Sequence, residues 1–417
     1  MKLEIAKGTR EIEPKEKIVM NYIIEVIKRN FELYGFSPIE TPILQRIDVL
    51  ASKYAGGAEI LKEIFKLNDQ GERELALRYD LTVPLGIYIA LNPNIKLPFK
   101  RYEIGKVFRD GPVSTERFRE FWQCDADVVG SASMVTDAEL MDLGLKTFRD
   151  LNLSVDIRVN NIKILKGIIL SANISDDKIS STILIIEKLK KIGVDGVKKE
   201  LKESGLNSIQ IDSVLSALLI DGTNSEKLNK LKLILKDNEG IKEMEKLIDY
   251  VPQINFDASL ARGLSYYTGT IFEVGLLNSK IKTTICSGGR YDNMIGDFID
   301  NNQKYPAVGI SFGLDRIYQV VEFDQKATAK VYVIPINTLK ESLSLARELR
   351  YNKINTSIDL MSRGISKNLD YANALGIPYV IFVGDNEIKE GKFKLKNMVS
   401  GNEEMLKIKD IINTLKD

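Results

Sequence analysis

The sequence predicts an α+β fold: an antiparallel sheet forms the main domain, a group of helices interrupts it, and a small α/β domain follows. Three observations support this. Between Leu75 and Gly130, short strand-like runs alternate with charged turns, as in antiparallel sheets. Over residues 163–252, apolar positions recur at helical spacing. Beyond residue 329, strand and helix patterns alternate, which indicates a mainly parallel sheet with covering helices.

The main domain is predicted in two parts, 1–162 and 253–325, on either side of the insertion. Its first part opens with a helix from Glu16 to Tyr34, then a turn at Gly35 and an extended piece at 39–41. The strand-like runs that follow are Leu75–Asp80, Arg101–Ile104, Lys106–Arg109 and Cys124–Val129. Strand patterns and glycines return between Asp257 and Gly313.

Helices are predicted within the insertion, 163–252, at Ser181–Ile192, Ile211–Ile220 and Ile241–Tyr250. The last domain, 329–417, is predicted to alternate between strand and helix. Its strands are Lys330–Ile336, Thr356–Leu360, Tyr379–Val383 and Lys392–Met398. Its helices are Leu339–Tyr351, Ile365–Leu375 and Glu403–Leu415.

Composition excludes several classes of chemistry. The chain of 417 residues contains no histidine and two cysteines, Cys124 and Cys286, so Ser-His-Asp and Cys-His catalysis, the usual zinc sites and a disulfide framework are all excluded. No apolar run is long enough to cross a bilayer and the first residues lack a signal core. We therefore expect a cytoplasmic protein with no membrane partner. The net charge of +1 neither favours nor excludes a nucleic acid.

Four segments are dense in polar residues although their surroundings have a strand pattern. They are RYDLTVP (78–84), the stretch from Arg101 to Gly130, ARGLSYYTGT (261–270) with SGGRYD (287–292), and GISFGLDR (309–316).

The second and fourth of these segments resemble motifs 2 and 3 of the class II aminoacyl-tRNA synthetases. Residues 35–42 with the preceding helix resemble motif 1, the dimer interface of that class. The third segment is more specific, because RGLSYYTGTIFE followed by SGGRYDN resembles the two histidine-binding signatures of the histidyl-tRNA synthetase family. GTREIEP near the start and YANALGIPYVIFVG near the end resemble the same family, so only the insertion is uninformative. The sequences RYDLT and QCDAD resemble its archaeal and eukaryotic branch.

This resemblance implies a class II catalytic domain, a C-terminal anticodon-binding domain, and a homodimer. The implied reaction joins L-histidine and ATP to form histidyl-adenylate and then charges tRNA(His), with Mg²⁺ held mainly by the ATP phosphates and not by protein His or Cys. Guanidinium groups suit phosphate oxygens because they bind them bidentately. By the family match, Arg109 and Arg262 contact the α-phosphate, Arg316 reaches the terminal phosphate, and Arg117 also belongs to the ATP site.

The same match places the substrate's α-ammonium against Asp80, Thr82 and Gln123. The imidazole ring lies between Asp127 and Tyr267, with Tyr266 and Tyr291 nearby. A buried site that hydrogen-bonds both ring nitrogens rejects apolar isosteres strongly.

Each of these residues taken singly has a simpler interpretation. Asp80 fits a strand-end cap, the Tyr266–Tyr267 pair fits a sheet core, and Arg119 with Glu120 fits a structural ion pair. Only the order and spacing of the whole set favour a synthetase. We interpret Cys124 and Cys286 as packing residues and not nucleophiles.

Two positions depart from the family pattern: Ser265 stands where many members have Asp, and Ser287 where many have Gly. We expect Ser265 to affect the positioning of Arg262, and neither departure to touch a ligand contact. Three rival functions remain. One is the histidine-sensing regulatory subunit of ATP phosphoribosyltransferase, which lacks the anticodon domain and the aminoacylation residues as a family. The others are a prolyl or threonyl enzyme, which lacks RGLSYYTG, and a non-catalytic RNA-binding module, which would not need all three arginines.

Overall fold

The computed structural model describes residues 3–48, 50, 61–114, 117–262, 266–277, 284–299 and 304–416. The chain divides into two compact units. One comprises Met1–Arg10 and Ile23–Val321, and the other comprises Glu11–Tyr22 and Glu322–Asp417. Within the described residues, no helix is both long enough and apolar enough to cross a membrane.

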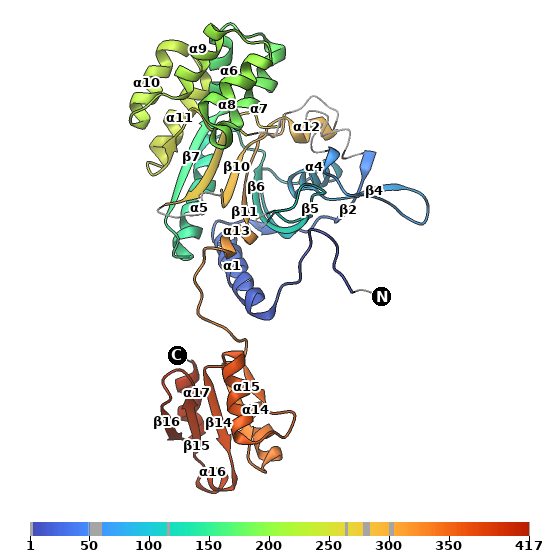
Figure 1. Ribbon diagram of the computed structural model, residues 1–417, viewed down its shortest axis with the longest axis vertical. Coiled ribbons are helices and arrows are strands. Elements are labelled where there is room, and N and C mark those ends of the chain that lie inside the picture. Colours follow the sequence, from blue (N-terminus) through green and yellow to red (C-terminus); the bar gives the residue numbers. More distant parts are fainter. Residues whose placement is uncertain are drawn as a thin grey trace. The chain divides into compact units, whose positions relative to one another are not determined.

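An eight-stranded sheet forms the centre of the first unit (Figure 1). In spatial order its strands are β1 (Ser37–Pro38), β5 (Phe99–Phe108), β6 (Glu120–Val129), β11 (Ala307–Gly313), β10 (Cys286–Arg290), β9 (Thr270–Leu276), β7 (Val155–Asn161) and β8 (Asn255–Phe256). Neighbours pair antiparallel except at the two edges, where β1 with β5 and β7 with β8 run parallel. The predicted antiparallel sheet is confirmed.

Three details of the predicted strands are wrong. The two runs on either side of Gly105 form the single strand β5, because pairing with β6 continues without a break through Gly105. Glycine at this position leaves space for the Arg78 guanidinium, to which an added Cβ would come within 2.2 Å. The run Leu75–Asp80 stops at Leu77, the end of β4 (Glu74–Leu77). The extended piece after Gly35 pairs through Ser37 and Pro38, before the predicted 39–41.

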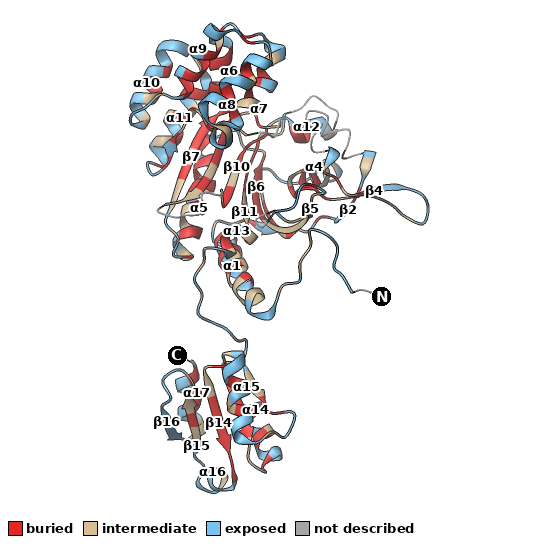
Figure 2. Cartoon of the chain, in the orientation of Figure 1, coloured by how far each residue is buried: buried red, intermediate tan, exposed pale blue. Residues whose placement is uncertain are grey.

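The two faces of the sheet differ in composition. Helices α1 (Pro14–Leu33) and α5 (Met134–Asp150) contribute rings to one face, where Phe312 packs against Phe31 and Phe148 at centroid distances of 5.8 and 5.4 Å. Figure 2 shows the buried strands of this centre in red. The opposite face carries charged and polar side chains beside α4 (Thr82–Leu91) and the short helices α12 (Met294–Ile299) and α13 (Leu314–Tyr318). A small sheet, β2 (Leu44–Arg46), β4 and β3 (Lys66–Asn68), adjoins it.

A layer of helices follows β7 (Figure 1). They are α6 (Ile162–Ser171), η1 (Asp176–Lys178), α7 (Ile179–Glu187), α8 (Leu189–Glu203), α9 (Ser208–Leu218), α10 (Asn224–Leu235) and α11 (Glu239–Tyr250). Predicted helices at 211–220 and 241–250 are confirmed to within three residues, as α9 and α11. The prediction of one helix over Ser181–Ile192 is wrong because the chain breaks at Lys188 into α7 and α8. Side-chain capping boxes at Asn207 and Thr223 begin α9 and α10.

The second unit carries a five-stranded sheet in the order β13 (Thr356–Ile358), β12 (Val331–Pro335), β14 (Tyr379–Val383), β15 (Phe393–Asn397) and β16 (Glu403–Leu406). Its helices are α14 (Leu339–Tyr351), α15 (Ile365–Leu375), α16 (Asp385–Glu390) and α17 (Ile408–Lys416). The prediction of one final helix over 403–415 is wrong, because Glu403 pairs with Lys394 and Lys396 across β15, which favours a strand. The sheet is therefore mixed: three strands are parallel and the last two antiparallel.

Candidate active site

A cavity of about 500 Å³ opens on the polar face of the eight-stranded sheet. Every site residue predicted from the sequence lines this cavity, although the residues come from segments more than two hundred positions apart. They are Asp80, Thr82, Arg109, Arg117, Gln123, Asp127, Arg262, Tyr266, Tyr267, Tyr291 and Arg316. The remaining departure from the family pattern, Ser265, lies outside the described residues.

Strand register builds the floor of the cavity. Residues directly opposite each other on neighbouring strands share a face of the sheet. At one level these are Glu103, Asp125, Ser311, Ser287, Glu273 and Arg158, in order across β5, β6, β11, β10, β9 and β7. We call this set the polar row. It brings carboxylates and hydroxyls from five strands into one line with the Arg158 guanidinium of the sixth, and the four central members of the row line the cavity.

Arg262 is held above one end of the polar row. Its Nη1 donates to Glu273 Oε1 at 3.2 Å and its Nη2 to Ser287 Oγ at 3.0 Å. Burial opposes ionisation of Glu273, but the cations Arg262 and Lys190 outweigh it and lower the pKa of that carboxyl. The expectation that Ser287 touches no proposed ligand contact is wrong in one respect, because its hydroxyl orients the guanidinium expected to bind phosphate.

Arg109 is held by rings. Its guanidinium carbon lies 4.2 Å from the centroid of Tyr79 and 5.0 Å from that of Phe121, and its Nε donates to the Tyr79 carbonyl at 3.3 Å. Stacking on aromatic faces orients an arginine without neutralising it. Within the described ranges no carboxylate forms an ion pair with Arg109, so its charge is available to an anionic ligand.

The other two predicted phosphate ligands are fixed at the rim of the cavity. Arg117 pairs with Glu63 at 2.7 Å, and Glu63 also accepts from the Tyr79 hydroxyl at 3.1 Å. Arg316, within the short helix α13, donates to the Thr284 carbonyl at 2.7 Å. Four guanidinium groups therefore line one cavity, an arrangement that suits a polyphosphate ligand.

The carboxylate end of the cavity is built around Asp127. The Tyr291 hydroxyl donates to its Oδ1, and Arg101 Nη2 lies 2.7 Å from its Oδ2. Gly309 of β11 lies opposite Asp127 of β6, and a Cβ added to it would come within 1.9 Å of Asp127 Oδ1. Only glycine therefore fits. Burial, opposed by Arg101, raises the pKa of Asp127.

Asp80, Thr82 and Gln123 complete this end. Asp80 Oδ1 accepts from the backbone amides of Thr82 and Val83 at 3.2 and 3.0 Å, so this side chain caps the start of α4 and not the end of a strand. Its role as a ligand of the substrate stays a prediction. Gln123 Nε2 donates to Ser311 Oγ at 2.9 Å. The Tyr266 ring lies 4.8 Å from that of Tyr267 and 5.9 Å from that of Tyr291, forming an aromatic wall.

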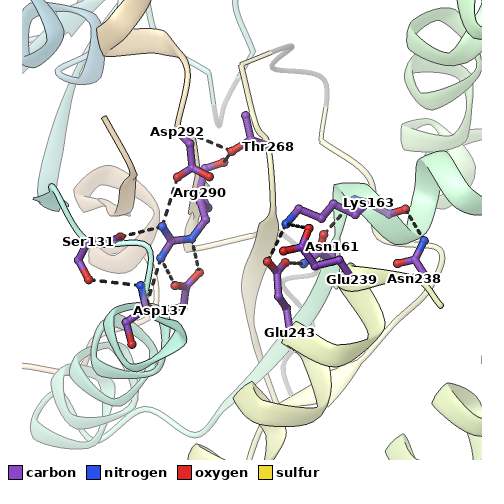
Figure 3. A network of polar contacts seen from close by, with 11 residues as sticks. Ser131, Asp137, Asn161, Lys163, Asn238, Glu239, Glu243, Thr268, Arg290 and Asp292 are labelled. Atoms are coloured by element: carbon purple, nitrogen blue, oxygen red, sulfur yellow. Dashed lines mark hydrogen bonds and ion pairs between the residues drawn. The ribbon is translucent and has the colours of Figure 1, made fainter. Parts of the chain in front are cut away.

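A polar network outside the cavity fixes the strand end that carries Tyr291 (Figure 3). Arg290 forms an ion pair with Asp137 of α5 and donates to the Ser131 carbonyl at 2.9 Å and to Asp292 at 3.2 Å. The Arg290 carbonyl accepts from the Thr268 amide at 2.8 Å. The two tyrosine-bearing segments are thus tied together behind the cavity.

Some residues important to the site were missed by sequence reasoning, and others took different partners. Asp125, Ser311 and Glu273 carry no special role in the motifs, and only strand register brings them to the cavity. Arg101 does not line the cavity, but it lies behind it as the ion-pair partner of Asp127. Arg119 and Glu120 do not pair with each other: Arg119 pairs with Asp110 at 3.0 Å and Glu120 with Lys106. Cys286 lines the cavity but is 2 % exposed, and burial raises the pKa of its thiol, which makes it a poor nucleophile.

No group of three His, Cys, Asp or Glu side chains arranged to hold a metal occurs among the described residues. An antiparallel-rich sheet that presents arginines on a ligand face, together with a C-terminal α/β unit, defines a class II aminoacyl-tRNA synthetase fold.

Comparison with known proteins identifies the family. The model described as "Histidyl-tRNA synthetase" matches residues 8–317, and that described as "Anticodon binding domain" matches 330–417. A histidine–tRNA ligase of Bacillus cereus is 43% identical over 100% of both chains. The crystal structure of histidyl-tRNA synthetase from Nostoc matches with a TM-score of 0.88 and 34% identity, covering 100% of this chain and 99% of that one. The chain belongs to the histidyl-tRNA synthetase family.

The comparisons bear on the predicted branch of the family and on the rival regulatory subunit. The Bacillus cereus and Nostoc proteins are bacterial, so the predicted similarity to the archaeal and eukaryotic branch is not supported. A Bacillus halodurans structure titled "ATP phosphoribosyltransferase regulatory subunit/histidyl-tRNA synthetase" has a TM-score of 0.75 at 20% identity, covering 89% of this chain and 96% of that one. At that identity the likeness concerns the fold alone.

Proposed function

We propose that this protein activates L-histidine with ATP to form histidyl-adenylate and transfers the histidyl group to the 3′-terminal adenosine of tRNA(His). One observation carries the proposal: the arginines and the carboxylate pocket predicted for this reaction line a single cavity. In the first step the histidine carboxylate attacks the α-phosphorus and pyrophosphate leaves. In the second, a ribose hydroxyl of the terminal adenosine attacks the acyl carbon and AMP leaves.

The arginine end binds ATP in this proposal. Arg109 and Arg262 hold the α-phosphate, where negative charge develops during attack, while Arg316 and Arg117 hold the remaining phosphates. Cations oriented before the reaction stabilise such charge most effectively. Mg²⁺ accompanies the ATP phosphates and offsets part of their charge. No side chain needs to act as a base, because the attacking carboxylate is already ionised.

The carboxylate end selects histidine. Asp127 accepts one imidazole N–H and the Tyr267 hydroxyl contacts the other nitrogen, with Tyr266 and Tyr291 enclosing the ring. Asp80, Thr82 and Gln123 receive the α-ammonium. The Arg101–Asp127 pair supports this assignment, since the guanidinium opposes the effect of burial on the pKa of Asp127 and so favours its ionised, accepting form.

The partners follow from the domains. We propose that 1–162 and 253–325 form the catalytic domain, that 329–417 reads the anticodon, and that the helical insertion 163–252 contacts the acceptor arm. Unchanged tRNA affinity after deletion of 163–252 in a folded variant would contradict the insertion's role. We further propose a cytoplasmic homodimer, which a monomeric mass in solution would rule out.

The decisive experiment is ATP–pyrophosphate exchange with purified protein, Mg²⁺ and each of the twenty amino acids separately. Exchange with histidine alone supports the proposal. Exchange with another amino acid would keep the class and change the substrate. Histidine binding without exchange would favour a silent regulatory relative.

A further inference from the structure

Asp125 is a buried carboxylate in the cavity wall to which the proposed function gives no role. It lines the cavity, is 2 % exposed, and lies between Gln123 and Asp127 on the same face of β6. Its cross-strand neighbours in the polar row are Glu103 and Ser311. A carboxylate in such a place lowers the stability of the fold unless donors satisfy its oxygens.

The surrounding donors satisfy only one oxygen of Asp125. The Ser311 hydroxyl bonds to the carboxyl group and accepts from Gln123 Nε2 on its other side. Asp125 Oδ1 has no hydrogen-bond partner among the described residues, nor has Gln123 Oε1. Glu103 supplies no donor, and its own oxygens accept from Arg78 and Thr41. Two buried acceptors in the cavity wall therefore have no protein donor within the part of the chain that is described.

The charges around Asp125 point to a cationic ligand. Burial raises the pKa of Asp125 to about 8, a shift that Arg101 opposes and that Asp127 and Asp80 reinforce. Arg101 lies closest to Asp127, which leaves Asp125 without a close cation of its own. The other ionisable groups facing this region are Arg78 and Glu103 on the β4–β5 side, Cys286 and Tyr291 on β10, Glu273 on β9, and Arg262 and Tyr267 before it.

We propose that Asp125 binds the substrate's α-ammonium directly, together with the Gln123 side-chain oxygen. An ammonium group has three N–H donors and one positive charge, so it matches two unpartnered acceptors of which one is a carboxylate. Asp80, which lies near enough to influence Asp125, faces the same group. This inference rests on the proposed function, because it takes an α-amino acid as the ligand. Asp125 thereby becomes a determinant of specificity for amino acids over their uncharged analogues.

The Asp125→Asn variant tests this role. It keeps the shape of the side chain and removes the charge. We expect the KM for histidine in pyrophosphate exchange to rise about 10- to 100-fold, since hydrogen bonds between charged groups are the strong ones. The KM for ATP should change by less than about twofold. Asp212→Asn, an exposed aspartate in the insertion, is the matched control and should leave both values unchanged.

A ligand comparison isolates the ammonium group. The α-hydroxy analogue of histidine carries a hydroxyl where histidine carries the ammonium, and its binding is measured by calorimetry. The wild-type protein should prefer histidine over this analogue, and Asp125→Asn should lose about 10-fold or more of that preference. Equal weakening of both ligands, or an unchanged KM for histidine, would overturn the proposal.

A third measurement separates ligand binding from a structural role. Without ligand, Asp125→Asn should melt at a higher temperature than wild type at pH 8, because it removes a buried charge. A lower melting temperature would mean that Asp125 serves the fold, and would overturn the proposal.

The wild-type protein alone provides a further test should the variant not fold. Its preference for histidine over the α-hydroxy analogue should rise about fivefold from pH 7 to pH 8, as Asp125 ionises, while a flat ratio overturns the proposal. Absence of histidine-dependent exchange in the wild type would contradict the proposed function. The binding comparisons need no catalysis and still decide the role of Asp125.

Discussion

The two faces of the eight-stranded sheet are formed by alternate residues of the same strands, yet they meet opposite requirements. On β11, Phe312 packs against Phe31 and Phe148, while its neighbour Ser311 faces the cavity and bonds to Gln123. The apolar face buries rings that hold the fold together. The polar face buries carboxylates and arginines, and Asp125 Oδ1 and Arg101 Nε have no hydrogen-bond partner among the described residues. A single strand therefore supplies stability on one side and unsatisfied binding groups on the other.

The largest expected effect is a loss of stability, without loss of activity, when the apolar face of the sheet is changed. Phe312→Ala removes a fully buried ring from the apolar face, and the cavity left behind should lower the free energy of unfolding by about 3–5 kcal/mol. Because the cavity-lining side chains remain, exchange activity per folded molecule should change little below the melting temperature. Urea denaturation with parallel exchange assays checks this. A large loss of kcat in folded protein would show that the faces are not independent.

The converse change is Arg262→Ala on the polar face. Removing a cation aimed at developing charge should lower adenylate formation about 100- to 1,000-fold, while histidine affinity and the melting temperature stay near wild type. Single-turnover exchange kinetics and calorimetry with histidine measure these quantities. Full activity would contradict the assigned role of Arg262, and lost histidine affinity would place it at the wrong end of the cavity.

A third prediction concerns pH and follows from Asp125. Its pKa is raised to about 8 in the fold, against roughly 4 for an unfolded aspartate. Between these values the unfolded chain releases a proton that the folded chain retains, so this group makes the fold less stable as pH rises. Relative to Asp125→Asn, the ligand-free wild type should lose up to about 2.5 kcal/mol between pH 6 and pH 8. Chemical denaturation at both pH values tests the sign, and a constant difference would show that Asp125 is ionised throughout.

The two faces also differ in how far the sequence predicts them. Hydrophobic spacing indicated α1, α14 and α15 to within two residues at either end, because apolar burial leaves a periodic signature. The motif residues of the cavity were predicted by resemblance. Arg101 and Asp125 were not, because their roles depend on which residues stand opposite each other on neighbouring strands, and local patterns do not determine register. The strand at Glu403–Leu406 was missed for the same reason, since its cross-strand partners stabilise it.

The smallest expected effect concerns the two acceptors on the polar face that hold the Arg262 guanidinium. Ser287 accepts from Arg262 Nη2 at 3.0 Å, while Glu273 holds Nη1 of the same guanidinium. Ser287→Gly, which restores the residue common in the family, removes one of these two acceptors. Because Glu273 remains, kcat for adenylate formation should fall only about two- to fivefold, the value of one ordinary hydrogen bond, with the KM for histidine unchanged. Thr284→Ser is a suitable control, because Arg316 donates to the backbone carbonyl of Thr284, which this substitution keeps. It should leave kcat unaltered. A drop in kcat as large as that of Arg262→Ala would mean that Glu273 alone does not orient the arginine, and that the hydroxyl in the polar row is the main determinant of its position.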